Sequence, residues 1–176
     1  MRIVVSGTHG SGKSTLIADF HAAHPHYRVL GDPFEDLDLD DPSGEASFAA
    51  QLRLTAARLE ATADASDVIA ERGPLDFLAY LTALDRLGRS GGSLLARATQ
   101  IVERSLATVD LVAVVPLDAA RPIRVPVEED PELREAMDDV LLELLDDLEQ
   151  DGAVRRSLVI TGDPVQRLQA LSDAVR

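Results

Sequence analysis

Residues 7–14 read Gly7-Thr8-His9-Gly10-Ser11-Gly12-Lys13-Ser14. They follow the pattern G-x-x-x-x-G-K-[ST], in which glycines let the backbone turn tightly and point its N–H groups at phosphate oxygens. The β-branched run 2–6 before the pattern predicts a buried strand, and residues 14–23 after it predict a helix. Because the amino end of a helix attracts anions, this strand–loop–helix unit is predicted to bind phosphate groups.

The two residues that close the pattern carry specific chemistry. Lys13 is expected to reach the β- and γ-phosphates of a nucleoside triphosphate, and the Ser14 hydroxyl to ligate Mg²⁺. His9 is interpreted as a spacer inside the loop. No Asn-Lys-x-Asp element for guanine is present, so ATP and Mg²⁺ are the expected cofactors. The expected nucleotide contacts are Gly7, Thr8, His9, Gly10, Ser11, Gly12, Lys13, Ser14 and Thr15.

Composition limits the class of protein. The 176 residues, 45% of them hydrophobic, predict one domain spanning 1–176. The absence of cysteine excludes disulfides and thiolate catalysis, and the net charge of −14 argues against a nucleic-acid partner. No apolar run reaches the ~20 residues needed to cross a bilayer. We therefore expect a cytoplasmic protein without a membrane partner, and a homodimer is left open.

Strand and helix patterns alternate along the whole chain. Short β-branched runs buried on both faces, separated by helices, predict a parallel sheet. The expected fold is α/β, with five parallel strands flanked by helices in three layers. The predicted strands are 2–6, 27–30, 68–70, 111–115 and 157–161, and the predicted helices are 14–23, 46–63, 74–87, 94–106, 131–150 and one from 164 onward. Acidic residues between the apolar positions of 131–150 predict a solvated outer face.

A magnesium site beside the loop needs a carboxylate at the end of a neighbouring strand. Glu71 directly follows the apolar run 68–70, whereas Asp118 is separated from its strand by Pro116 and Leu117. Glu71 is therefore the preferred metal acid, directly or through water. The alternative is that Glu71 and Arg72 form an exposed charged pair.

The segment Glu71-Arg72-Gly73-Pro74-Leu75-Asp76 resembles the Glu-Arg-Ser or Asp-Arg element of P-loop nucleoside and thymidylate kinases. It is especially similar to the version in small kinases related to ribosylnicotinamide kinase. Asp32-Pro33 resembles the catalytic acid pair of deoxynucleoside kinases, and Phe48-x-x-Gln51 with Arg58 resembles their base-recognition helix. The resemblance implies the P-loop NTPase fold and a kinase that moves the ATP γ-phosphate to a hydroxyl of a small, nucleoside-like molecule.

Each acceptor-side residue has two interpretations. Asp32 could take the proton of the acceptor hydroxyl, or it could simply open a turn. Gln51, Thr55 and Arg58 share one helix face, which could bind the acceptor or be solvated surface. Arg72 could bridge donor and acceptor. Asp76 could contact the acceptor, or it could stabilise the first turn of its helix.

The loop after the fourth predicted strand carries arginines. The region of approximately 116–134 is interpreted as a lid that closes over ATP and excludes water. By resemblance, Arg124 and Arg134 are its clamps, with Arg124 among the catalytic residues. Arg121 and Arg124 could instead offset acidic neighbours. Gly162 and Asp163, after the last strand, are expected to contact adenine.

Two other functions compete with this hypothesis. A regulatory NTPase would hydrolyse ATP to act on a protein partner, for which 131–150 could serve as a surface. A nucleoside monophosphate kinase would need several cations near the acceptor, and 31–66 offers only Arg53 and Arg58.

Overall fold

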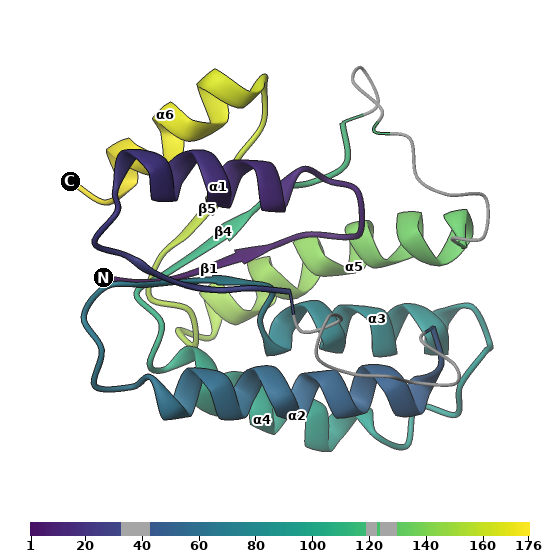
Figure 1. Ribbon diagram of the computed structural model, residues 1–176. Helices are drawn as coiled ribbons and strands as arrows, with labels where there is room; N and C mark the ends of the chain where they lie inside the picture. The colour runs from purple at the N-terminus through teal and green to yellow at the C-terminus, as the bar shows by residue number, and fades with distance from the viewer. Residues whose placement is uncertain (33–42, 119–122, 124–129) are drawn as a thin grey trace.

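A computed structural model of the protein describes residues 1–32, 43–118, 123 and 130–176. Its centre is a five-stranded parallel sheet in the order β2-β3-β1-β4-β5. Helices cover both faces of this sheet, which confirms the predicted three-layer α/β fold (Figure 1). The strands are β1 (Arg2–Ser6), β2 (Arg28–Leu30), β3 (Val68–Glu71), β4 (Leu111–Val114) and β5 (Ser157–Val159).

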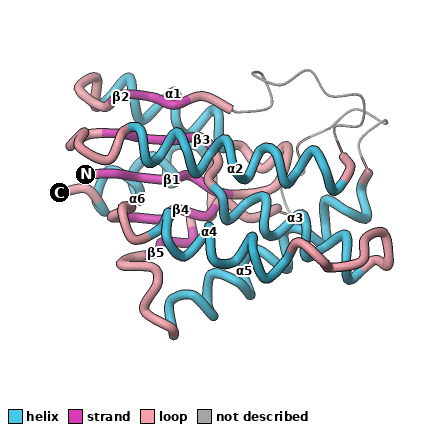
Figure 2. Tube along the Cα trace, turned by 90° about the horizontal axis from the view of Figure 1, so that it is seen from below, coloured by secondary structure: helices cyan, strands magenta, loops and turns pink. Residues whose placement is uncertain are grey.

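Alternation of side chains along the strands divides the core into two clusters. Ile3 and Val5 point to one face, beneath α1 (Lys13–Ala23) and α6 (Pro164–Ala174). Val4 points to the other, where the remaining four helices pack. Figure 2 shows these four in front of the sheet. They are α2 (Glu45–Ala61), α3 (Pro74–Arg86), α4 (Leu95–Leu106) and α5 (Pro131–Gln150).

The edges of the sheet differ from the expectation that every strand is buried on both faces. The three central strands are fully buried, whereas β2 exposes two of its three residues and β5 is only half-buried. The cause is the strand order, which places β2 and β5 at the edges, where each has a single neighbour.

Helix ends follow the predicted signals. The Asp130 side chain accepts the Leu133 N–H at 3.0 Å and Pro131 occupies the first turn of α5. Asp163 and Gln166 form a reciprocal capping box at the start of α6. These caps hold both helices where they meet the carboxyl edge of the sheet. No helix in the described parts of the chain is long and apolar enough to cross a membrane.

Candidate active site

The loop of residues 7–12 connects β1 to α1 at the carboxyl edge of the sheet, as predicted. Gly7 adopts a φ of 149°, and a Cβ there would lie 2.5 Å from the Val115 carbonyl oxygen. Any larger residue would therefore push the loop away from the end of β4. This contact explains the first glycine of the pattern, because the loop must pass directly against the neighbouring strand.

Lys13 lies beneath this loop with its ammonium group enclosed. Its Nζ donates to the Thr8 carbonyl oxygen at 2.8 Å, and its side chain is only slightly exposed. Burial, and after it the nearby positive charge of Arg72, lowers the pKa of Lys13 to about 7, against the attraction of Asp76 and Glu71. An anion in the loop would restore the charged form, which is the form that binds phosphate.

Ser14 and Glu71 come together as the metal hypothesis requires. The Ser14 hydroxyl donates to Glu71 Oε1 at 2.6 Å. The pairing of β1 with β3 in parallel register brings the end of β3 beside the loop. Glu71 is buried, which disagrees with the alternative of an exposed charged pair. An alcohol and a carboxylate are hard oxygen ligands that fit Mg²⁺, and phosphate oxygens would complete its coordination.

Arg72, the residue after Glu71, contacts both Asp32 and the phosphate loop. Its Nε lies 3.0 Å from Asp32 Oδ2, and its Nη1 donates to the Gly7 carbonyl oxygen at 3.1 Å. The side chain is 2% exposed. Burial alone would lower the pKa of Arg72, but interactions with Tyr80 and then Asp32 raise it overall. The permanent cation thus connects the phosphate loop to Asp32, which is itself half-buried.

Asp76 does not have the position expected for a substrate contact. It is 0% exposed, and both of its oxygens are occupied by protein. Oδ1 accepts the Gly7 N–H at 2.9 Å, and Oδ2 accepts the Ser6 hydroxyl at 2.8 Å and the Gly73 N–H at 2.9 Å. Asp76 therefore fastens the start of α3 to the phosphate loop, and the capping interpretation replaces the acceptor one.

The polar face of α2 is only partly available to a ligand. Gln51 is 0% exposed and Thr55 is also buried, so the surface interpretation is wrong for both. The Thr55 hydroxyl donates to the Gln51 carbonyl oxygen of its own helix at 2.8 Å. Gln51 Oε1 is buried without a hydrogen-bond partner in the described structure.

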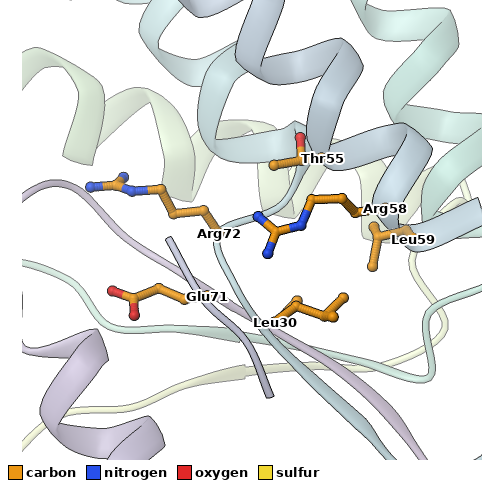
Figure 3. Close-up of a pocket in the computed structure, with 7 residues that line it drawn as sticks. Leu30, Thr55, Arg58, Leu59, Glu71 and Arg72 are labelled. Carbon is orange, nitrogen blue, oxygen red and sulfur yellow. The ribbon is translucent and has the colours of Figure 1, made fainter. Parts of the chain in front are cut away.

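Arg58 and Thr55 line a small cleft with the end of β3. Figure 3 shows the Arg58 side chain reaching from α2 toward the strand end that carries Glu71 and Arg72. Leu30, at the end of β2, forms the apolar floor. This cleft lies on the acceptor side of the loop and joins a cation to an apolar wall.

Tyr80 is a site residue that the sequence patterns did not reveal. Its hydroxyl lies 3.3 Å from Thr8 Oγ1 and accepts the His9 N–H at 3.4 Å. Its ring stacks on Phe48 at a centroid distance of 4.4 Å. Phe48, which the resemblance assigns to base recognition, is buried against Tyr80. The pair therefore connects α2 to the phosphate loop.

Two cavities lie on the β4–β5 side, where the donor base is expected. The larger, of about 410 Å³, is bordered by Gly10, Ser11, Leu117, Asp118, Ile123, Arg134, Glu135, Asp138, Asp139 and Arg167. The smaller, of about 90 Å³, adjoins the start of α1 at Gly12 and Thr15 and the start of α6 at Pro164. Gly162 and Asp163 lie in the turn before α6, and the Gly162 carbonyl oxygen accepts the Arg167 Nε at 2.8 Å.

Asp138 departs from the expected solvated face of α5. It is buried, its Oδ2 accepts the Leu117 N–H at 3.0 Å, and its Oδ1 has no hydrogen-bond partner in the described structure. Burial raises the pKa of this carboxyl. Asp138 faces the phosphate loop across the larger cavity, so this turn of α5 carries a carboxyl toward the site.

Only part of the predicted lid lies within the described residues. Arg121 and Arg124 lie outside the described residues, as does most of 116–134. Arg134 is described: its Nε donates to the His9 carbonyl oxygen at 2.8 Å and its Nη2 to Gly10 at 3.4 Å. It therefore contacts the outer side of the phosphate loop from α5.

A phosphate loop between β1 and α1, with an acid at the end of the adjacent strand, defines a P-loop protein. Deoxyadenosine kinase from M. mycoides with the products dCMP and a flexible dCDP bound superposes with a TM-score of 0.76 at 15% identity, covering 99% of this chain and 98% of that one. The same enzyme with bound dATP gives 0.75 at 16% identity, with 99% of both chains covered.

Thymidylate kinase from Candida albicans superposes with a TM-score of 0.62 at 18% identity, covering 98% of this chain and 89% of that one. At such identities these similarities establish the fold. A family model described as an AAA domain matches residues 2–154. The protein belongs to this AAA domain family. No curated protein sequence shows a significant match.

Proposed function

We propose that the protein is a Mg²⁺-dependent kinase that transfers the γ-phosphate of ATP to a hydroxyl group of a small, nucleoside-like molecule. The observation that carries this proposal is that two consecutive residues, Glu71 and Arg72, contact two different parts of the site. Glu71 pairs with Ser14 at the phosphate loop, and Arg72 pairs with Asp32 on the acceptor side. A protein that only hydrolyses ATP has no need for an ion pair between a buried arginine and a half-buried aspartate beside the phosphate loop.

Chemical roles follow from these positions. The loop N–H groups and Lys13 would hold the donor phosphates, and Ser14 and Glu71 would hold Mg²⁺, which supplies charge neutralisation between the β- and γ-phosphates. Asp32 would accept the proton of the acceptor hydroxyl. Arg72 would orient the Asp32 carboxylate through the contact of 3.0 Å between its Nε and Asp32 Oδ2. Exclusion of water around the bound acceptor would favour its phosphorylation over hydrolysis.

A specific observation keeps nucleoside monophosphates as a second candidate acceptor. Arg58 extends into the acceptor cleft toward Arg72 (Figure 3), and a guanidinium there suits an anionic group. Arg53, the other cation considered for this role, is exposed and borders a separate pocket between α2 and α4. Of the two cations considered, only Arg58 lines this cleft, which supports the uncharged nucleoside better than the monophosphate.

An ATP-consumption screen tests the proposal. Purified protein with Mg-ATP would be offered ribonucleosides, deoxynucleosides and their monophosphates, with Lys13→Ala as the blank. For the acceptor found, Asp32→Asn should lower kcat by about 100- to 10,000-fold. Asp64→Asn, an exposed carboxylate after α2, is the matched control and should retain activity. ATP hydrolysis that no metabolite changes would refute the kinase and favour the regulatory NTPase.

A further inference from the structure

Carbonyl groups of the phosphate loop are held by cationic side chains. Each of five consecutive carbonyl oxygens accepts a hydrogen bond from a lysine or an arginine. The donors are Arg72 to Gly7 at 3.1 Å, Lys13 to Thr8 at 2.8 Å, Arg134 to His9 at 2.8 Å and to Gly10 at 3.4 Å, and Arg167 to Ser11 at 2.8 Å. Such hydrogen bonds are about twice as strong as those between neutral groups.

These hydrogen bonds orient the backbone N–H groups of the phosphate loop. In a planar trans peptide the C=O of one residue and the N–H of the next point in opposite directions, and no described peptide is cis. A carbonyl drawn outward therefore turns the following N–H inward. Arg167, by holding the Ser11 carbonyl, directs the Gly12 N–H toward the space where a phosphate would lie.

We infer that Arg167, to which the sequence patterns give no role, is a positioning residue for the donor phosphates. This inference rests on the proposed ATP-binding function. Arg167 comes from α6, 156 residues away from Ser11. Its Nε is fixed by the Gly162 carbonyl oxygen at 2.8 Å, and the side chain is buried. One planar guanidinium thus spans the turn before α6 and the phosphate loop.

Gly12 shows how closely Arg167 approaches. Its φ is 98°, in the left-handed region, and a Cβ there would lie 2.8 Å from Arg167 Nη1. Gly12 is therefore required for two reasons. It allows the left-handed backbone conformation, and it leaves space for the Arg167 guanidinium. Lys13 is itself expected to bind phosphate, and Arg134 is only half-buried. Arg167, like Arg72 at the Gly7 end of the loop, is a buried support.

Calorimetric titration can separate this role from two others. Mg-ATP and magnesium tripolyphosphate would be titrated into the wild type, Arg167→Met and Arg167→Lys. Because Arg167 acts through the loop, Arg167→Met should weaken both ligands by the same factor, about tenfold, or ~1.4 kcal/mol. Lysine keeps the charge but cannot span two carbonyls, so Arg167→Lys should lose less, about threefold, again equally for both ligands.

Arg156→Met is the matched control. The Arg156 Nη2 donates to the Ala174 carbonyl oxygen at 3.2 Å, at the far end of the same helix. The Arg156→Met substitution therefore also removes an arginine that anchors α6, but at a place away from the phosphate loop. The affinities for Mg-ATP and for magnesium tripolyphosphate should both be unchanged. Thermal unfolding of each variant verifies that it is folded.

The outcomes are distinct. Weaker ATP with unchanged tripolyphosphate would overturn the inference, because Arg167 would then contact the nucleoside half directly. Unchanged affinity for both ligands in the two Arg167 variants would also overturn it. Wild type that binds Mg-ATP no better than Lys13→Ala would instead overturn the proposed function, and this inference with it.

Discussion

Replacing Asp76 by asparagine should destabilise the protein through one unpaired hydrogen-bond donor. The carboxylate accepts three hydrogen bonds of 2.8–2.9 Å, from Gly7, Ser6 and Gly73. Asparagine has one acceptor oxygen and one donor nitrogen. If its oxygen stays on the Gly7 N–H, the nitrogen meets the Gly73 N–H; if it is flipped, the nitrogen meets the Gly7 N–H. The Ser6 hydroxyl can rotate, but in either orientation one buried backbone N–H has no acceptor.

Leaving a buried donor unsatisfied costs about 1–3 kcal/mol. For a domain of this size, each kcal/mol lowers Tm by about 2–4 °C. The free energy of unfolding would be measured by urea denaturation monitored by circular dichroism. Asp85→Asn, exposed on the same helix, is the control and should stay within ~0.5 kcal/mol of wild type. If the free energy of unfolding of Asp76→Asn were equally close to that of wild type, the argument from an unsatisfied backbone N–H would be refuted.

Three further predictions concern the ligands. The pKa of Lys13 is lowered to about 7, and bound phosphate would raise it. Mg-ATP binding should therefore take up protons between about pH 7 and 10, and the affinity should weaken as pH rises through this range. Calorimetry in buffers of different ionisation enthalpy measures the proton uptake, which must disappear in Lys13→Met. Glu71→Gln should raise the Mg²⁺ concentration for half-maximal ATP turnover by about 10- to 100-fold, and an unchanged Mg²⁺ titration would exclude Glu71 from the metal site. Tyr80→Phe keeps the ring stack on Phe48 but loses the hydroxyl near Thr8; it should weaken ATP binding by about three- to tenfold, and equal Kd values would show that the hydroxyl is dispensable.

Local sequence patterns predict those parts of the site that are formed by residues close together in the chain. The glycine spacing of residues 7–14 predicts the loop because backbone geometry is local. Glu71 was found because a parallel strand delivers its last residue to a known edge of the sheet. The pairing of Ser14 with Glu71 at 2.6 Å agrees with this reasoning.

Long-range contacts were beyond such patterns. Arg167 and Tyr80 meet the loop from helices distant in sequence, and nothing in their own segments distinguishes them from other surface or core residues. Asp138 was assigned to the solvated face of α5, because a helical period cannot tell which acid faces the loop after β4. Asp76 was recognised as a site residue, but its partners depend on three separate elements.

Arg72 has consequences for how such a site can change. It is the sole non-glycine residue with a positive φ, 65°, in the described parts of the chain, and its N–H donates to the Val5 carbonyl oxygen at 3.0 Å. This turn sends Glu71 to Ser14 and Arg72 to Asp32. A single peptide unit therefore sets the spacing between the Glu71–Ser14 contact and the Arg72–Asp32 ion pair. An insertion or deletion at this point would change the distance between these two contacts.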